Sequence, residues 1–379
     1  MEEFRVGLGS RIRSARERLR LTQKGLADEA RLPAPQVVSQ IEKGQREVKA
    51  WELVNLAEAL HVEMADLLSP EEMRPRPIVL WRERPRHDKE LIESEFLQRC
   101  ERYGFLERLS GACAEKDLPQ KPVDIQRISF EDVDELAEDT RLDLDLGSRP
   151  AGSLVSVLEN RFGTKIWYEK LGEGGSAAST KDAFGPGILM NADEAPWRRN
   201  FNFAHEVFHL ITWDSVPLEL LLDNASVWDR AEKLANAFAS CLLLPANAVE
   251  TALFNRVDKG KARFTDLVEM AREFDVSADA LLVRLAKLGF LTKDSVESLR
   301  KNPSFRKVDR ESRKASWWEP PVMPERFVRL AFMAYLEGKL SRARLAQYLE
   351  TSLIDLSEFL LQYGFNDRED YEAEVRTPG

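Results

Sequence analysis

The chain has 379 residues, of which 43% are hydrophobic and 32% are charged, and its formal net charge is -10. At roughly 150 residues per domain this length predicts two or three domains, and the composition excludes a wholly disordered protein. No apolar run reaches the roughly 18 residues of a membrane span, and three cysteines without a CxxC pair fit no disulfide framework. We therefore expect a cytoplasmic protein with reduced cysteines and no membrane partner.

The first 70 residues contain apolar side chains at helical spacing, such as Leu8, Ile12 and Leu19, in short segments separated by turn signals. Thr22 is a suitable N-cap residue, and Pro33 interrupts the helical pattern soon afterwards. The pattern predicts an all-α helix-turn-helix domain over residues 1–70.

Prolines and changes of periodicity divide the rest of the chain. Within it, strands are expected at 164–168 and 187–191, and the text LGEGGSAAS between them predicts a flexible turn. The predicted fold class is mainly α with a small α+β part. The predicted parts are a linker and helical scaffold over 71–146, an α+β domain over 147–299, a basic linker over 300–325 and a C-terminal helical, helix-turn-helix-like unit over 326–379.

The segment FNFAHEVFHLITW contains an HExxH motif formed by His205, Glu206 and His209, among apolar residues at helical spacing. Residues four apart lie on one face of a helix, so both imidazoles can bind one metal ion. Glu206 can then reach a water molecule on the metal without binding the ion itself. The motif predicts a Zn²⁺ site with a general base beside it. The alternative, a chance motif on a partly buried helix, is disfavoured because the chain has only four histidines.

Catalytic zinc usually has three protein ligands, so a third donor must come from another segment. Positions 212 and 215 hold threonine and serine, where a metzincin motif would have glycine and histidine. The third ligand should therefore be a carboxylate. The next long helical pattern offers Glu232, with Asp229 as the alternative. Asn236 lies one turn after Glu232, where its side chain could accept a hydrogen bond from a ligating histidine and fix the tautomer of that histidine.

Zinc held by two histidines and a glutamate lowers the pKa of its water toward about 7, and Glu206 can pass the proton to the leaving amine. This chemistry is peptide-bond hydrolysis. The developing oxyanion needs a further donor, for which Tyr168 at the end of an expected strand is a candidate. The alternative role of Tyr168 is that of a half-buried strand residue.

These two motifs resemble those of the ImmA/IrrE-type metallopeptidases, in which HExxH is followed by ExxANxFAxxLLxP. The second pattern here reads EKLANAFASCLLLP, and the resemblance covers roughly residues 147–292. It implies a gluzincin-like zincin domain with a short sheet. It also implies a zinc endopeptidase that cleaves a partner repressor encoded nearby and so derepresses stress- or phage-response genes. The site residues implied are Glu206 as general base, and His205, His209 and Glu232 as zinc ligands.

Positive charge is concentrated in the first segment, because residues 1–49 contain 11 Lys and Arg against 7 Asp and Glu, whereas 50–69 contain none against 4. The text LTQKGLADEA followed by VVSQIEKG resembles lambda-repressor-like, XRE-type DNA-binding domains, which read paired half-sites as homodimers. The alternative is a domain that has lost DNA binding and docks a repressor. The candidate DNA contacts are Gln23, Gln36 and Gln40 on bases or phosphates, and Lys43 and Arg46 on the backbone.

Two basic segments, 74–87 and 300–314, lie close to tryptophans, namely Trp81 in the first and Trp317 and Trp318 after the second. Such segments could bind single-stranded DNA, or their tryptophans could dock on the rest of the protein.

Two hypotheses follow for the whole chain. The first is a DNA-binding zinc endopeptidase. The second is an XRE-type regulator or antitoxin whose metallopeptidase-like half acts as a sensor and does not cleave.

Overall fold

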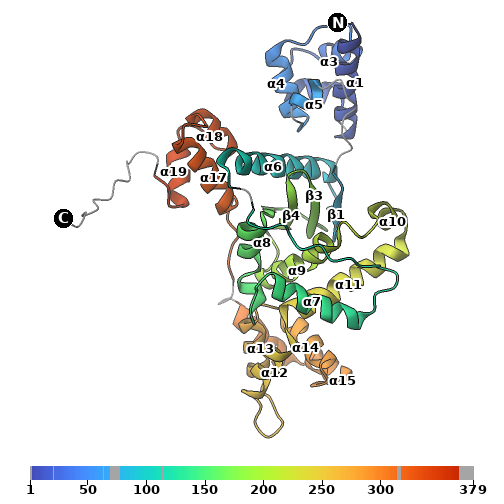
Figure 1. The fold of residues 1–379 in the computed structure, drawn as a ribbon, viewed down its shortest axis with the longest axis vertical. Helices are drawn as coiled ribbons and strands as arrows, with labels where there is room; N and C mark the ends of the chain where they lie inside the picture. The colour runs from blue at the N-terminus through green and yellow to red at the C-terminus, as the bar shows by residue number, and fades with distance from the viewer. Residues whose placement is uncertain are drawn as a thin grey trace, which may run out of the picture.

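The chain folds into a mainly helical structure with one small four-stranded sheet, which confirms the predicted fold class (Figure 1). The N-terminal helices form one end of the molecule, and the long helix α6 (Lys89–Ser110) runs between them and the sheet. The structure is a computed structural model, and it describes residues 2–19, 21–62, 64–68, 77–112, 114–313 and 317–366.

Five helices form the N-terminal domain, around a hydrophobic cluster that includes Leu26 and Ile41. The hydroxyl of Thr22 caps the second helix by accepting a hydrogen bond from the Gly25 N–H at 3.0 Å, and Pro35 occupies the first turn of the third. The helices are α1 (Glu2–Arg18), α2 (Gln23–Glu29), α3 (Pro35–Glu42), α4 (Ala50–Ala59) and α5 (Met64–Leu68).

The sheet has the strand order β1-β3-β4-β2, in which only β2 and β4 are parallel. Its strands are β1 (Val79–Trp81), β2 (Lys165–Glu169), β3 (Ala177–Asp182) and β4 (Gly185–Asn191). The sequence predicted β2 and β4 but not the other two. The expected flexible turn in fact leads into β3, whose small and polar residues have no hydrophobic alternation, and β1 is a three-residue strand within the expected linker.

Alternate residues of each strand face two different hydrophobic clusters, as the period of two requires. Ile166 and Ile188 belong to the cluster that contains the helix with the HExxH motif, whereas Trp167 and Leu189 belong to the cluster that contains α6. The sheet therefore separates two helical layers.

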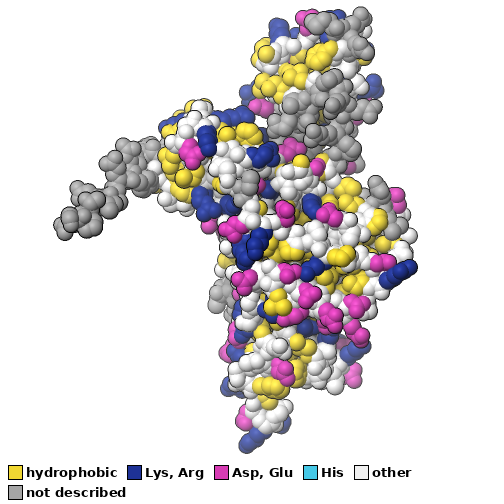
Figure 2. All heavy atoms as spheres, viewed as in Figure 1, with side chains coloured by type: hydrophobic (Ala, Val, Ile, Leu, Met, Phe, Trp, Pro, Cys, Tyr) yellow, Lys and Arg dark blue, Asp and Glu magenta, His cyan; other side chains and the backbone are white. Residues whose placement is uncertain are grey.

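The first layer contains the motif helix and the acidic helix α7, and Figure 2 shows Asp and Glu side chains gathered over the region of α7. Its helices are α7 (Phe130–Asp143), η1 (Pro150–Gly152), α8 (Leu154–Phe162), α9 (Pro196–Thr212), α10 (Leu218–Asp223), α11 (Ala225–Leu243), α12 (Ala246–Phe254), α13 (Phe264–Glu273), α14 (Ala278–Lys287), α15 (Lys293–Lys301) and α16 (Pro303–Ser312).

The second layer joins α6 to the C-terminal helices, so the described residues 326–366 do not form a separate unit as the sequence suggested. The ring of Phe327 packs against Trp167 of β2 and Tyr103 of α6, with centroid separations of 5.0 and 5.2 Å. The shared core arises because one face of the sheet is apolar and needs cover. The C-terminal helices are α17 (Glu325–Leu336), α18 (Arg342–Tyr348) and α19 (Leu356–Gln362).

The expected basic linker at 300–325 also needs correction, because its first part is the helix α16. Asn302 caps this helix, Phe305 is buried against α13, and Asp309 forms an ion pair with Arg272. A short helix with many charged residues shows little apolar periodicity in its sequence, because only one or two of its residues face the core.

The tryptophans near the basic segments contact the protein itself. Trp81 is buried in β1 and donates its indole N–H to Glu93 at 2.7 Å, which argues against a role in stacking on a single strand. The guanidinium of Arg199 lies 4.2 Å from the Trp318 ring centroid, and Trp317 packs against Trp197. Docking of these tryptophans is therefore the alternative that the structure supports.

Among the described helices, none alone is both long and apolar enough to cross a membrane. Only α11 and α12 taken together, with a bend of 51° between them, meet that criterion of length and composition.

Candidate metal centre

The HExxH motif lies in α9, which begins with Pro196 at its first turn and packs between the sheet and α11. The side chains of His205 and Glu206 are fully buried, and His209 is 5% exposed. As predicted, the two histidines project from one face of the helix, and their Nε2 atoms lie 3.2 Å apart.

Glu232 of α11 completes a group of three donors. Its carboxylate oxygens lie 3.3 Å from His205 Nε2 and 3.2 Å from His209 Nε2. Tetrahedral zinc with ligands at about 2.0–2.1 Å requires ligand atoms about 3.3 Å apart, a spacing that the two Nε2 atoms nearly have. The two glutamate distances are of the same size but involve different oxygens, Oε2 toward His205 and Oε1 toward His209. These residues therefore fit a zinc ion by donor type and by spacing. The alternative ligand Asp229 instead forms an exposed ion pair with Lys233 at 2.6 Å.

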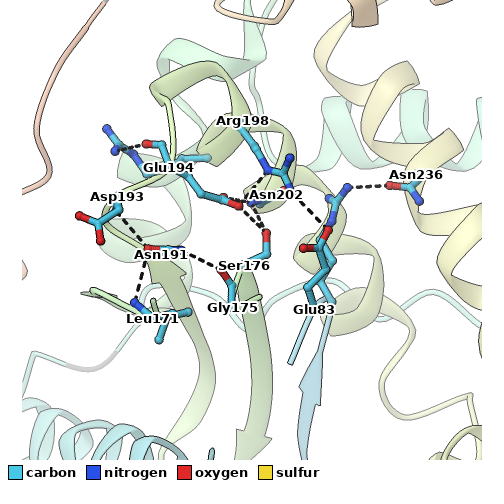
Figure 3. A network of polar contacts seen from close by, with 12 residues as sticks. Glu83, Leu171, Gly175, Ser176, Asn191, Asp193, Glu194, Arg198, Asn202 and Asn236 are labelled. Carbon is cyan, nitrogen blue, oxygen red and sulfur yellow. Dashed lines mark hydrogen bonds and ion pairs between the residues drawn. The ribbon is translucent and has the colours of Figure 1, made fainter. Parts of the chain in front are cut away.

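Asn236 lies beside this group, one turn of α11 beyond Glu232. Its Oδ1 atom is 3.2 Å from His205 Nδ1 and accepts a hydrogen bond of 3.0 Å from Arg82 Nη2 (Figure 3). Arginine can only donate, so the side-chain atom that faces it must be the amide oxygen. That oxygen can only accept, so His205 carries its proton on Nδ1 and presents an unprotonated Nε2 to the three-donor group.

The ionisation of the three donor side chains favours binding of a cation. Burial lowers the pKa of His205 to about 4, which keeps its ring neutral. Burial opposes ionisation of Glu232, but hydrogen bonds from His205 and His209 overcome it and lower the pKa to about 2. Burial also acts against a charge on His209, yet the hydrogen bond to Glu232 raises its pKa.

Glu206 has no contact with solvent, and this burial raises its pKa to about 7. The positive charge on His209, the hydroxyl of Ser179 and the guanidinium of Arg82 act in the opposite direction. A carboxyl group near neutrality can both take and return a proton at physiological pH. Glu206 therefore has the acidity expected of a general base and acid.

Comparison with known proteins agrees with this geometry. Residues 159–286 match the IrrE N-terminal-like domain, a metallopeptidase family, and residues 8–69 match a helix-turn-helix domain. The chain carries an IrrE-like metallopeptidase domain. The radiation response metalloprotease IrrE of Deinococcus deserti is 35% identical over 104 residues, which are 26% of this chain and 36% of that protein.

The match to the Deinococcus protein spans about a third of its length. A transcriptional regulator of Mycobacterium tuberculosis is 16% identical over 50% of this chain and 51% of its own, with a TM-score of 0.32, which is too low to indicate a common fold.

Tyr168 does not reach the metal centre of the IrrE-like domain, so its expected role as oxyanion donor was wrong. It lies on β2, at the opposite edge of the sheet from β1. Its ring packs against Phe203 of α9 and against Trp318, with centroid separations of 6.0 and 6.5 Å. Phe203 is two residues from His205 and hence on the far side of the helix.

Sequence reasoning missed three residues around the metal centre. Arg82 follows β1, Ser179 is in β3, and the ring of Trp228 stacks on His209 with a centroid separation of 6.3 Å and an angle of 7°. Neither β1 nor β3 was predicted, so nothing placed Arg82 or Ser179 near the motif. For Trp228, its position one turn before Glu232 on the same helix was a usable signal.

The helix-turn-helix domain places the five predicted DNA contacts differently. Gln36, Gln40 and Lys43 are exposed, the first two on α3 and the third at its end. By contrast, Gln23 donates to the carboxylate of Glu42 at 2.8 Å, and both terminal nitrogens of Arg46 bond Glu52. The polar groups of these two residues have partners within the domain, and their contacts with DNA stay a prediction.

Proposed function

We propose that this protein is a zinc-dependent endopeptidase with a DNA-binding domain, which cleaves a partner transcriptional repressor and thereby derepresses stress- or phage-response genes. The observation that carries the proposal is the convergence of His205, His209 and Glu232, whose donor groups lie 3.2–3.3 Å from one another, as the ligands of one zinc ion would. A buried carboxyl group, Glu206, lies beside them on the same helix.

The residues of the chain divide the chemistry between them. A zinc ion held by the three ligands would supply Lewis acidity for activating water and polarising a peptide carbonyl. Glu206 takes a proton from the attacking water and delivers it to the nitrogen of the peptide bond that breaks. Asn236 keeps His205 in the tautomer that presents Nε2.

The DNA-binding part of the proposal rests on α3. Its exposed residues Gln36 and Gln40 have amide groups that can pair with adenine in the major groove, and Lys43 at its end can contact a phosphate. A homodimer would read two half-sites. Binding of this kind would bring the peptidase domain close to a repressor on the same promoter in the cytoplasm.

The test is co-expression of the full chain with the repressor encoded by the adjacent gene, followed by mass spectrometry of the fragments. We expect zinc-dependent cleavage at one site, reduced by at least about 100-fold in Glu206→Gln because general base catalysis contributes about 10²- to 10⁴-fold. Glu250→Gln, an exposed glutamate on α12, is the matched control and should cleave normally.

Two results would contradict the endopeptidase. One is a purified chain without bound zinc, and the other is undiminished cleavage by Glu206→Gln. If the wild type cleaves nothing but protects its own promoter in footprinting, and Glu206→Gln protects it equally, the chain is a regulator whose peptidase-like half does not cleave.

A further inference from the structure

Arg82 comes from outside the matched peptidase segment, yet its side chain contacts Asn236, the residue beside His205. Its backbone N–H donates to the Ala177 carbonyl at 3.0 Å, which continues the pairing of β1 with β3 beyond Trp81. Its Nη2 atom donates to Asn236 Oδ1 at 3.0 Å, across 154 positions of sequence. Arg82 is thereby anchored at both its backbone and its side chain.

A second set of contacts holds the chain beside Arg82 (Figure 3). Glu83 accepts a hydrogen bond of 3.2 Å from Arg198 of α9, and Arg198 also donates to Glu194 at 2.8 Å. Glu194 accepts a further hydrogen bond of 2.8 Å from Ser176, which precedes β3. This network ties the end of β1 to the helix that carries the metal ligands, so Arg82 keeps its position relative to them.

Of the two terminal nitrogens of the Arg82 guanidinium, only Nη2 has a hydrogen-bond partner among the described residues. The Nη1 atom is buried and has no hydrogen-bond partner among the described residues. The group lies over the ring of Phe201, at 5.3 Å from the centroid, one turn before His205 on α9. A buried arginine nitrogen without an acceptor destabilises the fold, so its presence at this position calls for a function.

The charged groups that act on Arg82 include two carboxylates of the site. The carboxylates of Glu206 and Glu232 both act on the Arg82 guanidinium, and they offset part of the effect of its burial. A cationic donor that shares Asn236 with His205 and interacts electrostatically with the general base could stabilise negative charge on a peptide oxygen during hydrolysis. Tyr168, the donor expected from the sequence, lies elsewhere.

We infer that Arg82 is a catalytic residue that binds the carbonyl oxygen of the scissile peptide through Nη1, while Nη2 remains bonded to Asn236. The inference rests on the proposed peptidase function and adds a residue to it. As water adds to the carbonyl carbon, the π electrons move to the oxygen, and the Nη1–H hydrogen bond strengthens with the charge. Glu206 takes the proton from water and passes it to the amide nitrogen as the C–N bond breaks.

The experiment uses the zinc-loaded full chain and two probes. Inorganic phosphate is a tetrahedral oxyanion, whereas imidazole is a neutral ligand that can occupy an open metal position without offering a charged oxygen to arginine. Both affinities are measured by isothermal titration calorimetry for the wild type and for Arg82→Lys, which keeps the charge but not the two-nitrogen fork. Arg84→Lys is the matched control, two positions along the same segment and exposed.

We expect Arg82→Lys to lose about 10-fold or more in phosphate affinity, as for one hydrogen bond to a charged group, and to keep its zinc stoichiometry and imidazole affinity. Arg84→Lys should match the wild type with both probes. For any peptide that the wild type cleaves, Arg82→Lys should lower kcat far more than it changes KM.

Phosphate binding within threefold of the wild type in Arg82→Lys would overturn the role of Arg82, as would a zinc-loaded wild type that binds no phosphate. Retained zinc stoichiometry in the variant separates these outcomes from misfolding. A wild-type chain that binds no zinc would instead refute the peptidase function itself.

Discussion

Replacement of Asn236 by leucine tests whether the amide oxygen prepares His205 for zinc. In Asn236→Leu, the Nδ1–H of His205 and Nη2 of Arg82 lose the acceptor that lies 3.2 and 3.0 Å from them. Removing such an outer partner of a ligating histidine typically weakens metal binding 10- to 100-fold, or about 1.4–2.7 kcal/mol. Leucine is similar in size to asparagine and favours helix, so α11 should persist.

Zinc affinity is best measured by competition with a chromophoric chelator at pH 7. The dissociation constant should rise 10- to 100-fold in Asn236→Leu. Asp229→Asn serves as control, because Asp229 is exposed on the same helix and pairs only with Lys233 among the contacts seen. The reasoning would be refuted by an Asn236→Leu affinity within threefold of the wild type, or by an equal loss in Asp229→Asn.

Three further predictions concern stability. In Gly9→Ala the new Cβ would lie 2.2 Å from the carbonyl oxygen of Ile41, so limited proteolysis should release the N-terminal domain faster, whereas Gly25→Ala, with ordinary contacts, should not. Burial raises the pKa of Glu159 from 4.5 to about 7, so its contribution to stability is present below pH 4.5 and lost as the pH rises through 7. Glu159→Gln should therefore have a free energy of unfolding up to about 3 kcal/mol higher than the wild type at pH 8, and nearly the same value at pH 4.5. A difference in unfolding free energy that is independent of pH would contradict this. Finally, zinc at 1,000 times its dissociation constant should stabilise the chain by about 4 kcal/mol, seen as a lower melting temperature after chelation, and an unchanged temperature would count against a bound ion.

The motif helix and its partner helix could be predicted because their information is local. The spacing of His205 and His209 places both on one helix face, and Glu232 and Asn236 repeat the same interval on the next helix. Their packing follows from two apolar helix faces close in sequence. The residues of the candidate metal site could thus be named from the sequence, whereas the distances between their donor atoms could not.

The residues around the site are brought together by pairing of strands and side chains that are distant in sequence, which no local sequence pattern predicts. Arg82 lies 123 positions before His205 and reaches the site only because the short strand β1 pairs with β3. Tyr168 looked suitable in sequence but lies on the strand at the other edge of the sheet. In the same way, Gln23 and Arg46 look free until Glu42 and Glu52 are placed next to them.

The amino-acid sequence by itself determined the helical character of the chain, the HExxH motif and the helix-turn-helix domain, because helix periodicity and motif spacing are set within a few residues. Tertiary structure alone decided the strand order, the shared core of the C-terminal helices and the position of Arg82. Strand pairing and the covering of a sheet face join segments that are distant in sequence, and they depend on which surfaces meet rather than on what any one segment prefers.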